Sequence, residues 1–225
     1  MVSEVIIILL YNNLAILATA EGGKNSEGEE KEFTGKLFLI VGPSGSGKGT
    51  VIDEIEKQYP GFVFPVSHTT RDPRKGEVDG DTYHFTSKEK FKAMIEAGEF
   101  LEYAVVHSDN YYGTSKEDIL GPLRQGSVVI REVDIQGFHS IRDLLPEENL
   151  VSIFMKVSDL EDLTQRILRR GELPKEELQR RLQSAQKELE QAKDCNYQVE
   201  NQWGKIGECV RAVLKIILAE IKDLY

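Results

Sequence analysis

The sequence predicts an α/β fold around a parallel sheet, and three observations support that prediction. Residues 37–41 form a short, continuous apolar run, which is typical of a strand buried on both faces of a parallel sheet. A glycine-rich turn follows, and apolar residues then recur at helical spacing in residues 51–59. Another strand-like run, residues 128–133, ends in Asp134, at the kind of strand end where ligands of open α/β sheets bind.

Length and composition narrow the protein class. The 225 residues allow one large domain, or one domain with an appendage. The formal charge of −10 argues against nucleic acid or an anionic membrane as a partner, because phosphate-rich surfaces select positive proteins. Two cysteines, Cys195 and Cys209, are too few for a disulfide framework, so we expect a reducing, cytoplasmic setting.

Residues 1–35 differ from the rest of the chain. Residues 5–20 are apolar but too short to span a bilayer, and a basic segment expected of a secretory signal is missing before them. The acidic, glycine-containing stretch that follows has the composition of a disordered connector. Residues 1–35 hold six Glu and two Lys, a net −4, and we expect a dispensable extension before a domain at 36–225.

The turn after the first strand matches G-x-x-x-x-G-K. Glycines let consecutive backbone N–H groups converge on phosphate oxygens, while a helix N-terminus and a lysine supply positive potential. A chance glycine turn is the alternative, and the flanking strand and helix argue against it. The predicted phosphate contacts are Gly42, Pro43, Ser44, Gly45, Ser46, Gly47, Lys48, Gly49 and Thr50.

Gly49 occupies the place where many nucleotide triphosphatases carry a magnesium-binding Ser or Thr. This departure favours the small nucleotide kinases over GTPases and motor ATPases. In such a kinase Mg2+ is held mainly by phosphates and water, and we assign no side chain to it.

A second constellation follows the strand-like residues 62–66. Arg71 and Arg74 lie three apart across a proline, with the Ser67 and Thr70 hydroxyls beside them. Paired guanidiniums with neighbouring hydroxyls can hold a phosphate monoester, although a solvated loop with surface arginines explains the same residues.

Taken together, the motifs resemble guanylate kinase of the bacterial type, and the resemblance covers the chain from about residue 35 onward. It rests on GPSGSGKGT, SHTTRDPRKGEVDGDTYHF, FLEYAVVHSDNYYGT, REVDIQG and the arginine-rich DLTQRILRRG and QRRLQSAQKE. The resemblance implies a phosphate-loop nucleoside monophosphate kinase fold. Its parts would be a five-stranded parallel core sheet with helices on both faces, a small mixed β GMP-binding region (about 67–126) and a helical lid (about 160–185).

The resemblance also implies the roles of individual residues. It implies that the GMP phosphate and base are held by Ser67, Arg71, Arg74, Tyr83, Glu102, Tyr112, Gly113 and Thr114. A carboxylate such as Glu102 can accept from guanine N1–H and the 2-amino group, and a hydroxyl such as Thr114 can bond O6. Two alternatives stay open, because Thr114 also begins a capping box before a helix at 116–123 and Glu102 is also an outward strand residue.

The acids at the end of residues 128–133 are assigned less sharply. Asp134 is expected near guanine or a magnesium-bound water, and Glu132 is either a second acidic partner or an ordinary strand residue. Both are placed in the GMP-binding set.

The arginines near the C-terminal third match the family's lid. A capping box at 158–161 begins a helix, and Pro174 begins the next. Arg166, Arg170 and Arg181 match positions that embrace the transferring phosphates, where a solvated helical face is the alternative. The catalytic set implied is Lys48, Arg71, Arg166, Arg170 and Arg181, and Asn201 matches a position near the ATP base.

The function implied is transfer of the γ-phosphoryl group of ATP to GMP or dGMP, with Mg2+ and without an obligate protein partner. Catalysis would come from positioning and electrostatic clamping. Two rival functions are a related kinase with another monophosphate or sugar phosphate, and a non-catalytic module that binds phosphopeptides through Arg71 and Arg74.

Overall fold

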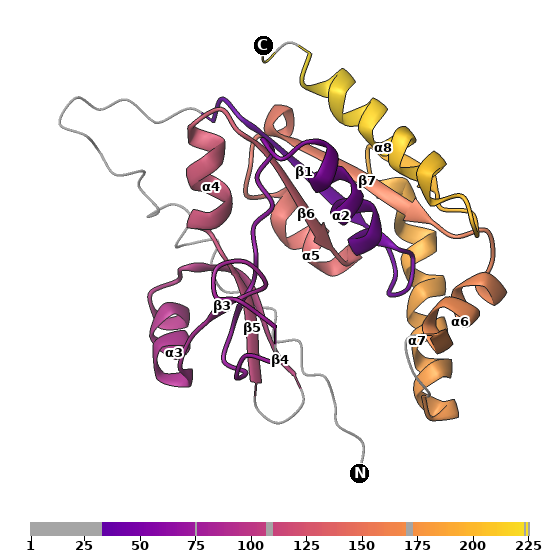
Figure 1. Cartoon of the computed structure of the whole chain (residues 1–225), viewed down its shortest axis with the longest axis horizontal. Coiled ribbons are helices and arrows are strands. Elements are labelled where there is room, and N and C mark those ends of the chain that lie inside the picture. The colour runs from indigo at the N-terminus through magenta and orange to yellow at the C-terminus, as the bar shows by residue number, and fades with distance from the viewer. Residues whose placement is uncertain (1–32, 75, 107–109, 170–172, 223, 225) are drawn as a thin grey trace. The chain divides into compact units, whose positions relative to one another are not determined.

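A computed structural model describes residues 33–74, 76–106, 110–169, 173–222 and 224. The chain divides into two compact units (Figure 1). The core unit comprises Thr34–Phe64 and Gly126–Tyr225, and the inserted unit comprises Pro65–Gln125. Of the expected extension, residues 1–35, only residues 33–35 lie in the described part of the chain. Arg170 lies outside the described residues as well.

The core unit contains a parallel sheet in the order β6-β1-β7-β8. Its strands are β1 (Lys36–Val41), β6 (Val128–Val133), β7 (Leu150–Lys156) and β8 (Tyr197–Glu200). Because neighbouring strands are parallel, their carboxyl ends meet at one edge of the sheet, where β1 leads into the glycine-rich loop.

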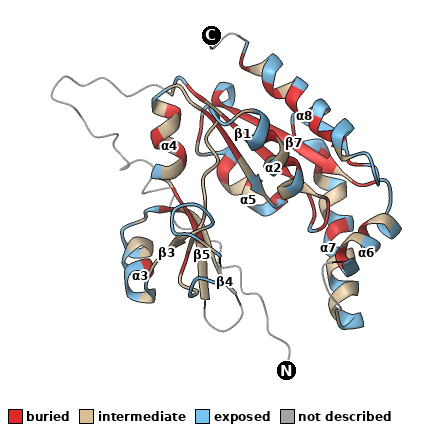
Figure 2. Cartoon of the chain, in the orientation of Figure 1, coloured by how far each residue is buried: buried red, intermediate tan, exposed pale blue. Residues whose placement is uncertain are grey.

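Helices cover both faces of this sheet. Residues 37–41 of β1 are fully buried, and red runs along β1 and β7 in Figure 2. Phe38 and Ile40 belong to a cluster shared with α2 (Lys48–Gln58) and α8 (Ile206–Glu220). Side chains alternate between the two faces of a sheet along each strand. Helix α5 (Ile135–Arg142) packs against β1 and β6 on the face opposite to the one that α2 and α8 cover. The predicted α/β class with a doubly covered parallel sheet is confirmed.

The expected fifth strand is reduced to a single bridge. Val63 pairs in parallel with Val129 of β6, donating to Val128 O at 2.8 Å, while its carbonyl accepts from Ile130 N at 2.9 Å. Residues 62–66 thus occupy the fifth position beside β6 without forming a regular strand. Pro65 removes one backbone donor from this short segment, which limits the ladder.

The inserted unit holds a small mixed sheet in the order β3-β2-β5-β4. The strands are β2 (His68–Thr69), β3 (His84–Phe85), β4 (Phe100–Val106) and β5 (Asn110–Ser115). Only β2 and β3 run parallel in it, and the other two pairings are antiparallel. Helices α3 and α4 span Lys88–Glu96 and Glu117–Arg124.

Two helix starts differ from the expected capping boxes. Thr114 lies in β5 and does not cap α4; instead Ser115 Oγ accepts from Glu117 N at 3.1 Å. At α6 (Leu160–Arg169), Asp159 Oδ1 accepts from Asp162 N at 2.7 Å, so the cap is Asp159 rather than Ser158. Carboxylates and hydroxyls are both good N-caps, so a shift of one residue in the start of the helix changes which side chain accepts the bond.

The remaining elements are α7 (Lys175–Glu190) and two short 3-10 turns, η1 (Glu147–Asn149) and η2 (Gln191–Asp194). Within the described ranges, every helix is too short or too polar to cross a bilayer.

Candidate active site

The glycine-rich loop connects β1 to the first turn of α2. Gly47 has a φ of +92°, and a Cβ on it would stand 2.4 Å from Asn201 Nδ2. A side chain is therefore excluded there by both backbone conformation and space. The N-cap of α2 is this glycine, which has no side chain to bond the N–H groups of the first turn, as suits a helix N-terminus that binds an anion.

Lys48, the first residue of α2, curls back over the loop. Its Nζ donates to Gly42 O at 2.6 Å and to Pro43 O at 3.2 Å. The ammonium group is thus held above the loop, where it adds positive charge to that of the helix N-terminus. Thr50 is exposed on the same turn.

Acidic side chains border the loop at the carboxyl end of β6. Glu132 Oε2 lies 3.8 Å from the position that a Cβ on Gly49 would occupy. Asp134 caps α5, since its Oδ1 accepts from Gly137 N at 2.7 Å. Both carboxylates therefore lie at the sheet edge that the strand pattern predicted.

Glu188 of α7 is a third acid near this edge. Its Oε2 is buried, with no hydrogen-bond partner among the described residues. Burial raises the pKa of Glu188, the Asp134 carboxylate raises it further, and Lys48 opposes the shift. In the part of the chain that the structure describes, no three His, Cys, Asp or Glu side chains are placed to hold a metal by themselves.

The predicted lid arginines have different surroundings. Arg166 Nη2 donates to Asn201 O at 2.6 Å, and the buried Asn201 donates through Nδ2 to Ser46 O at 2.8 Å. Arg166 and Asn201 are thereby joined to the phosphate loop. Arg181, in contrast, donates through Nε to Glu177 of its own helix at 2.9 Å.

In the inserted unit, Arg71 is held by a carboxylate. Its Nη1 and Nη2 donate to the two oxygens of Glu77 at 2.9 and 2.8 Å. The hydrogen bond with Glu77 is the main reason that the pKa of Arg71 is raised and that the pKa of Glu77 is lowered. Glu77 also accepts from the backbone N–H of Arg74 at 2.6 Å, so it links the Arg71 side chain to the backbone at Arg74.

Aromatic rings surround the same guanidinium. The Arg71 Cζ lies 5.5 Å from the ring centre of Tyr83 and 5.8 Å from that of Phe85. The Tyr83 and Tyr112 rings meet edge to face at 5.9 Å. The structure thus brings together Arg71, Tyr83 and Tyr112 from separate stretches of sequence, while the Arg74 residue is exposed and Ser67 leads into β2.

Glu102 and Thr114 face each other across β4 and β5. They are register partners, and Thr114 Oγ1 donates to Glu102 Oε1 at 2.6 Å. Thr114 is buried, and Gly113 beside it has no room for a side chain, since a Cβ would meet Phe91 and Phe100 at 3.0 Å. The Thr114 hydroxyl therefore donates its proton to the Glu102 carboxylate.

Sequence reasoning missed three acids that the structure ties to site residues: Glu77, Asp162 and Glu188. Asp162 had a readable signal, because an acid four residues before Arg166 on a helix predicts an ion pair. The sequence carries no such signal for Glu77 and Glu188, because the conformation of a loop brings Glu77 to Arg71 and the packing of α7 brings Glu188 near Asp134.

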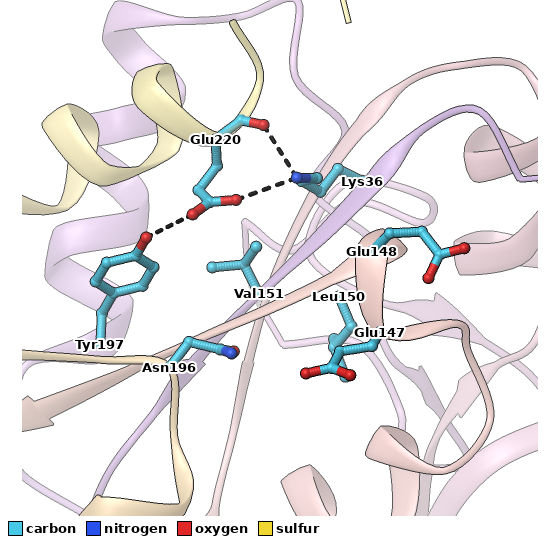
Figure 3. A pocket seen from close by; sticks show the side chains of 8 residues that line it. All are labelled: Lys36, Glu147, Glu148, Leu150, Val151, Asn196, Tyr197 and Glu220. Atoms are coloured by element: carbon cyan, nitrogen blue, oxygen red, sulfur yellow. Dashed lines mark hydrogen bonds and ion pairs between the residues drawn. The ribbon is translucent and has the colours of Figure 1, made fainter. Parts of the chain in front are cut away.

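The core unit also has a cavity of about 580 Å3 at the opposite edge of the sheet (Figure 3). Lys36, at the start of β1, donates there to Glu220 O at 3.0 Å and to Oε2 at 3.1 Å, and Tyr197 donates to the same carboxylate. The amino ends of β1, β7 and β8 border this cavity, so it is separate from the phosphate loop.

Comparisons with known proteins agree with this geometry. The guanylate kinase family model matches residues 34–220. A guanylate kinase of Clostridioides difficile is 45% identical over 168 residues, 75% of this chain and 80% of that protein. One from Caldanaerobacter subterraneus is 42% identical, covering 85% and 93% of the two chains. The crystal structure of guanylate kinase from Anaplasma phagocytophilum superposes with a TM-score of 0.62 at 27% identity, covering 84% and 87%. The chain therefore belongs to the guanylate kinase family.

Proposed function

We propose that this protein transfers the γ-phosphoryl group of ATP to GMP, and to dGMP, giving ADP and the nucleoside diphosphate. Family membership supports the reaction, and the Glu102–Thr114 pair is the observation that supports the choice of acceptor. The phosphate loop supports ATP as the donor.

Guanine recognition follows from the chemistry of that pair. The Thr114 hydroxyl donates its hydrogen bond to Glu102, and this bond fixes the carboxylate in place. Guanine presents two donors, N1–H and the 2-amino group, to a carboxylate, whereas adenine presents an unprotonated N1. With adenine, the part of the half-buried carboxylate that faces the base would have no donor, which is costly, so the pair discriminates against adenine.

The GMP phosphate would bind at the cluster of Arg71, Tyr83 and Tyr112, with Arg74 and Ser67 beside it. Glu77 keeps the Arg71 guanidinium oriented. An oriented guanidinium binds phosphate with less loss of side-chain entropy than a free one.

On the core unit, the glycine-rich loop of residues 42–50 would hold the ATP phosphates through backbone N–H groups, which Pro43 does not have, with Lys48 as the fixed positive charge and Asn201 toward the base. Charge spreads over the equatorial oxygens during phosphoryl transfer, so cations that meet that charge lower the barrier. Arg166, Arg170 and Arg181 are assigned to this task together with Arg71.

Mg2+ suits the acids at the loop. Mg2+ is usually bound through one or two carboxylates plus substrate phosphates and water, and Glu132 and Asp134 lie at the sheet edge beside the loop. These two carboxylates would accept hydrogen bonds from its water ligands. The ion, when bound, neutralises charge between the β- and γ-phosphates.

A coupled assay of ADP formation with GMP, dGMP, AMP, UMP and CMP, with and without Mg2+, tests the proposal. We expect turnover of the two guanine nucleotides only, and only with Mg2+. AMP turned over as fast as GMP would mean another monophosphate kinase. Phosphopeptide binding without any turnover would mean a non-catalytic module.

Lys48→Ala should reduce kcat by a factor of at least about 100, because it removes charge stabilisation of the transition state. A kcat like that of the wild type would contradict the assignment of the loop.

A further inference from the structure

Arg166 is fixed by two neighbours of different origin. On α6, its Nε and Nη2 donate to Asp162 Oδ1 and Oδ2 at 2.8 and 2.9 Å. Nη2 also donates to the backbone carbonyl of Asn201 after β8. Two anchors on separate elements define the plane of a guanidinium, which one ion pair along a helix does not.

The remaining nitrogen of that guanidinium faces the phosphate loop. Nη1 takes part in none of these bonds, and it lies 3.7 Å from the point where a Cβ on Gly47 would stand. The three bonds therefore orient Arg166 so that one N–H-bearing nitrogen is directed at the residue that caps α2.

A tryptophan completes the arrangement. The Arg166 Cζ lies 5.4 Å and the Arg169 Cζ 4.4 Å from the ring centre of Trp203, the only tryptophan in the chain. Trp203 is 42% exposed, and the two guanidiniums next to its ring gain cation–π attraction.

The contact with Asp162 reduces the positive charge that Arg166 can offer to a phosphate. The side chains of Asp162 and Arg166 are only 10% and 15% exposed, so the carboxylate offsets much of the positive charge that a phosphate would meet. Such a pairing beside an anion site is useful when orientation matters more than net charge, as in phosphoryl transfer.

We propose that Asp162 is a positioning residue, supported by Trp203, which holds Arg166 with Nη1 directed at the phosphates in the loop. Arg166 then acts from a fixed place on the core unit. This inference rests on the proposed function, because it concerns the phosphates of ATP.

The test is a double-mutant cycle of Asp162→Asn and Arg166→Lys in the ATP and GMP assay. We expect Asp162→Asn to lower kcat about 10- to 100-fold, the range for a misplaced catalytic group, with KM for GMP changed less than about twofold. In the Arg166→Lys background the same change should have almost no further effect, because the guanidinium that it positions is gone. Asp162→Glu, which can still reach position 166, should recover most of the activity.

Glu161→Gln is the matched control. It removes the same charge from the same helical turn, but Glu161 is exposed, so kcat should stay within about twofold of the wild-type value. Trp203→Ala, at an exposed position, is a second variant that does not depend on the stability of α6. It should lower kcat, and Trp203→Phe should retain it.

Tryptophan fluorescence supplies a readout without turnover. Loss of the Asp162 contact should change the Trp203 emission of the free enzyme and weaken ATP binding measured by fluorescence titration. Equal effects of Asp162→Asn in both backgrounds, or an effect no larger than that of Glu161→Gln, would overturn the inference. Wild-type protein without GMP turnover would instead contradict the proposed function.

Discussion

Replacement of Glu102 by glutamine tests guanine recognition most directly. The side chain keeps its size but loses its charge and gains a donor, so one of the two guanine donors no longer has an acceptor. A hydrogen bond to a charged group contributes about 1.5 to 3 kcal/mol, and the Thr114–Glu102 bond shows that this carboxylate is well placed to accept. At about 1.4 kcal/mol per factor of ten, KM for GMP should rise roughly 10- to 150-fold.

The assay compares kcat and KM for GMP and AMP in the wild type and in Glu102→Gln. Because an amide can donate to adenine N1, the ratio of kcat/KM for GMP to that for AMP should fall by more than the GMP value alone. Glu96→Gln, which changes an exposed acid at the end of α3, is the control. It should leave KM for GMP and the ratio of kcat/KM for GMP to that for AMP unchanged. An unchanged KM for GMP in Glu102→Gln would remove Glu102 from the base site.

Three further predictions concern stability. Gly47→Ala should destabilise the fold by about 2 to 4 kcal/mol in urea unfolding, since it combines backbone strain at φ +92° with loss of the Asn201 hydrogen bond; a cost below about 0.5 kcal/mol would contradict the close approach. Glu188→Gln should raise the melting temperature at pH 8 but not at pH 4. Burial and Asp134 hold its folded pKa above the usual 4.5, so its charge opposes folding only above that pH, and an equal effect at both values would contradict the argument. Phe38→Ala, at a fully buried position in β1, should cost about 3 to 5 kcal/mol, whereas a smaller loss would mean that the core around β1 collapses to fill the space.

The local parts of the site could be predicted from the sequence. Residues 37–41 and the turn after them specify a buried strand and a phosphate loop through continuous hydrophobicity and glycine spacing, which act over a few residues. The strand end at Asp134 was predicted for the same reason.

Short elements were predicted less well. Residues 62–66 became one bridge, and Thr114 lies in a strand where a capping pattern was expected. Cap and strand signals of a few residues differ by small free energies, so tertiary contacts decide between them.

The sequence by itself determined which residue types stand beside the phosphate loop, but not how their side chains pair. Arg71 is bound by Glu77, and Thr114 donates to Glu102 across two strands. Arg166 is joined to Asn201, 35 residues away in the chain. Such pairs form only when packing brings distant backbone segments within hydrogen-bond distance. For that reason the chemical inventory could be read from the sequence, while the orientation of each catalytic group was decided by the tertiary structure.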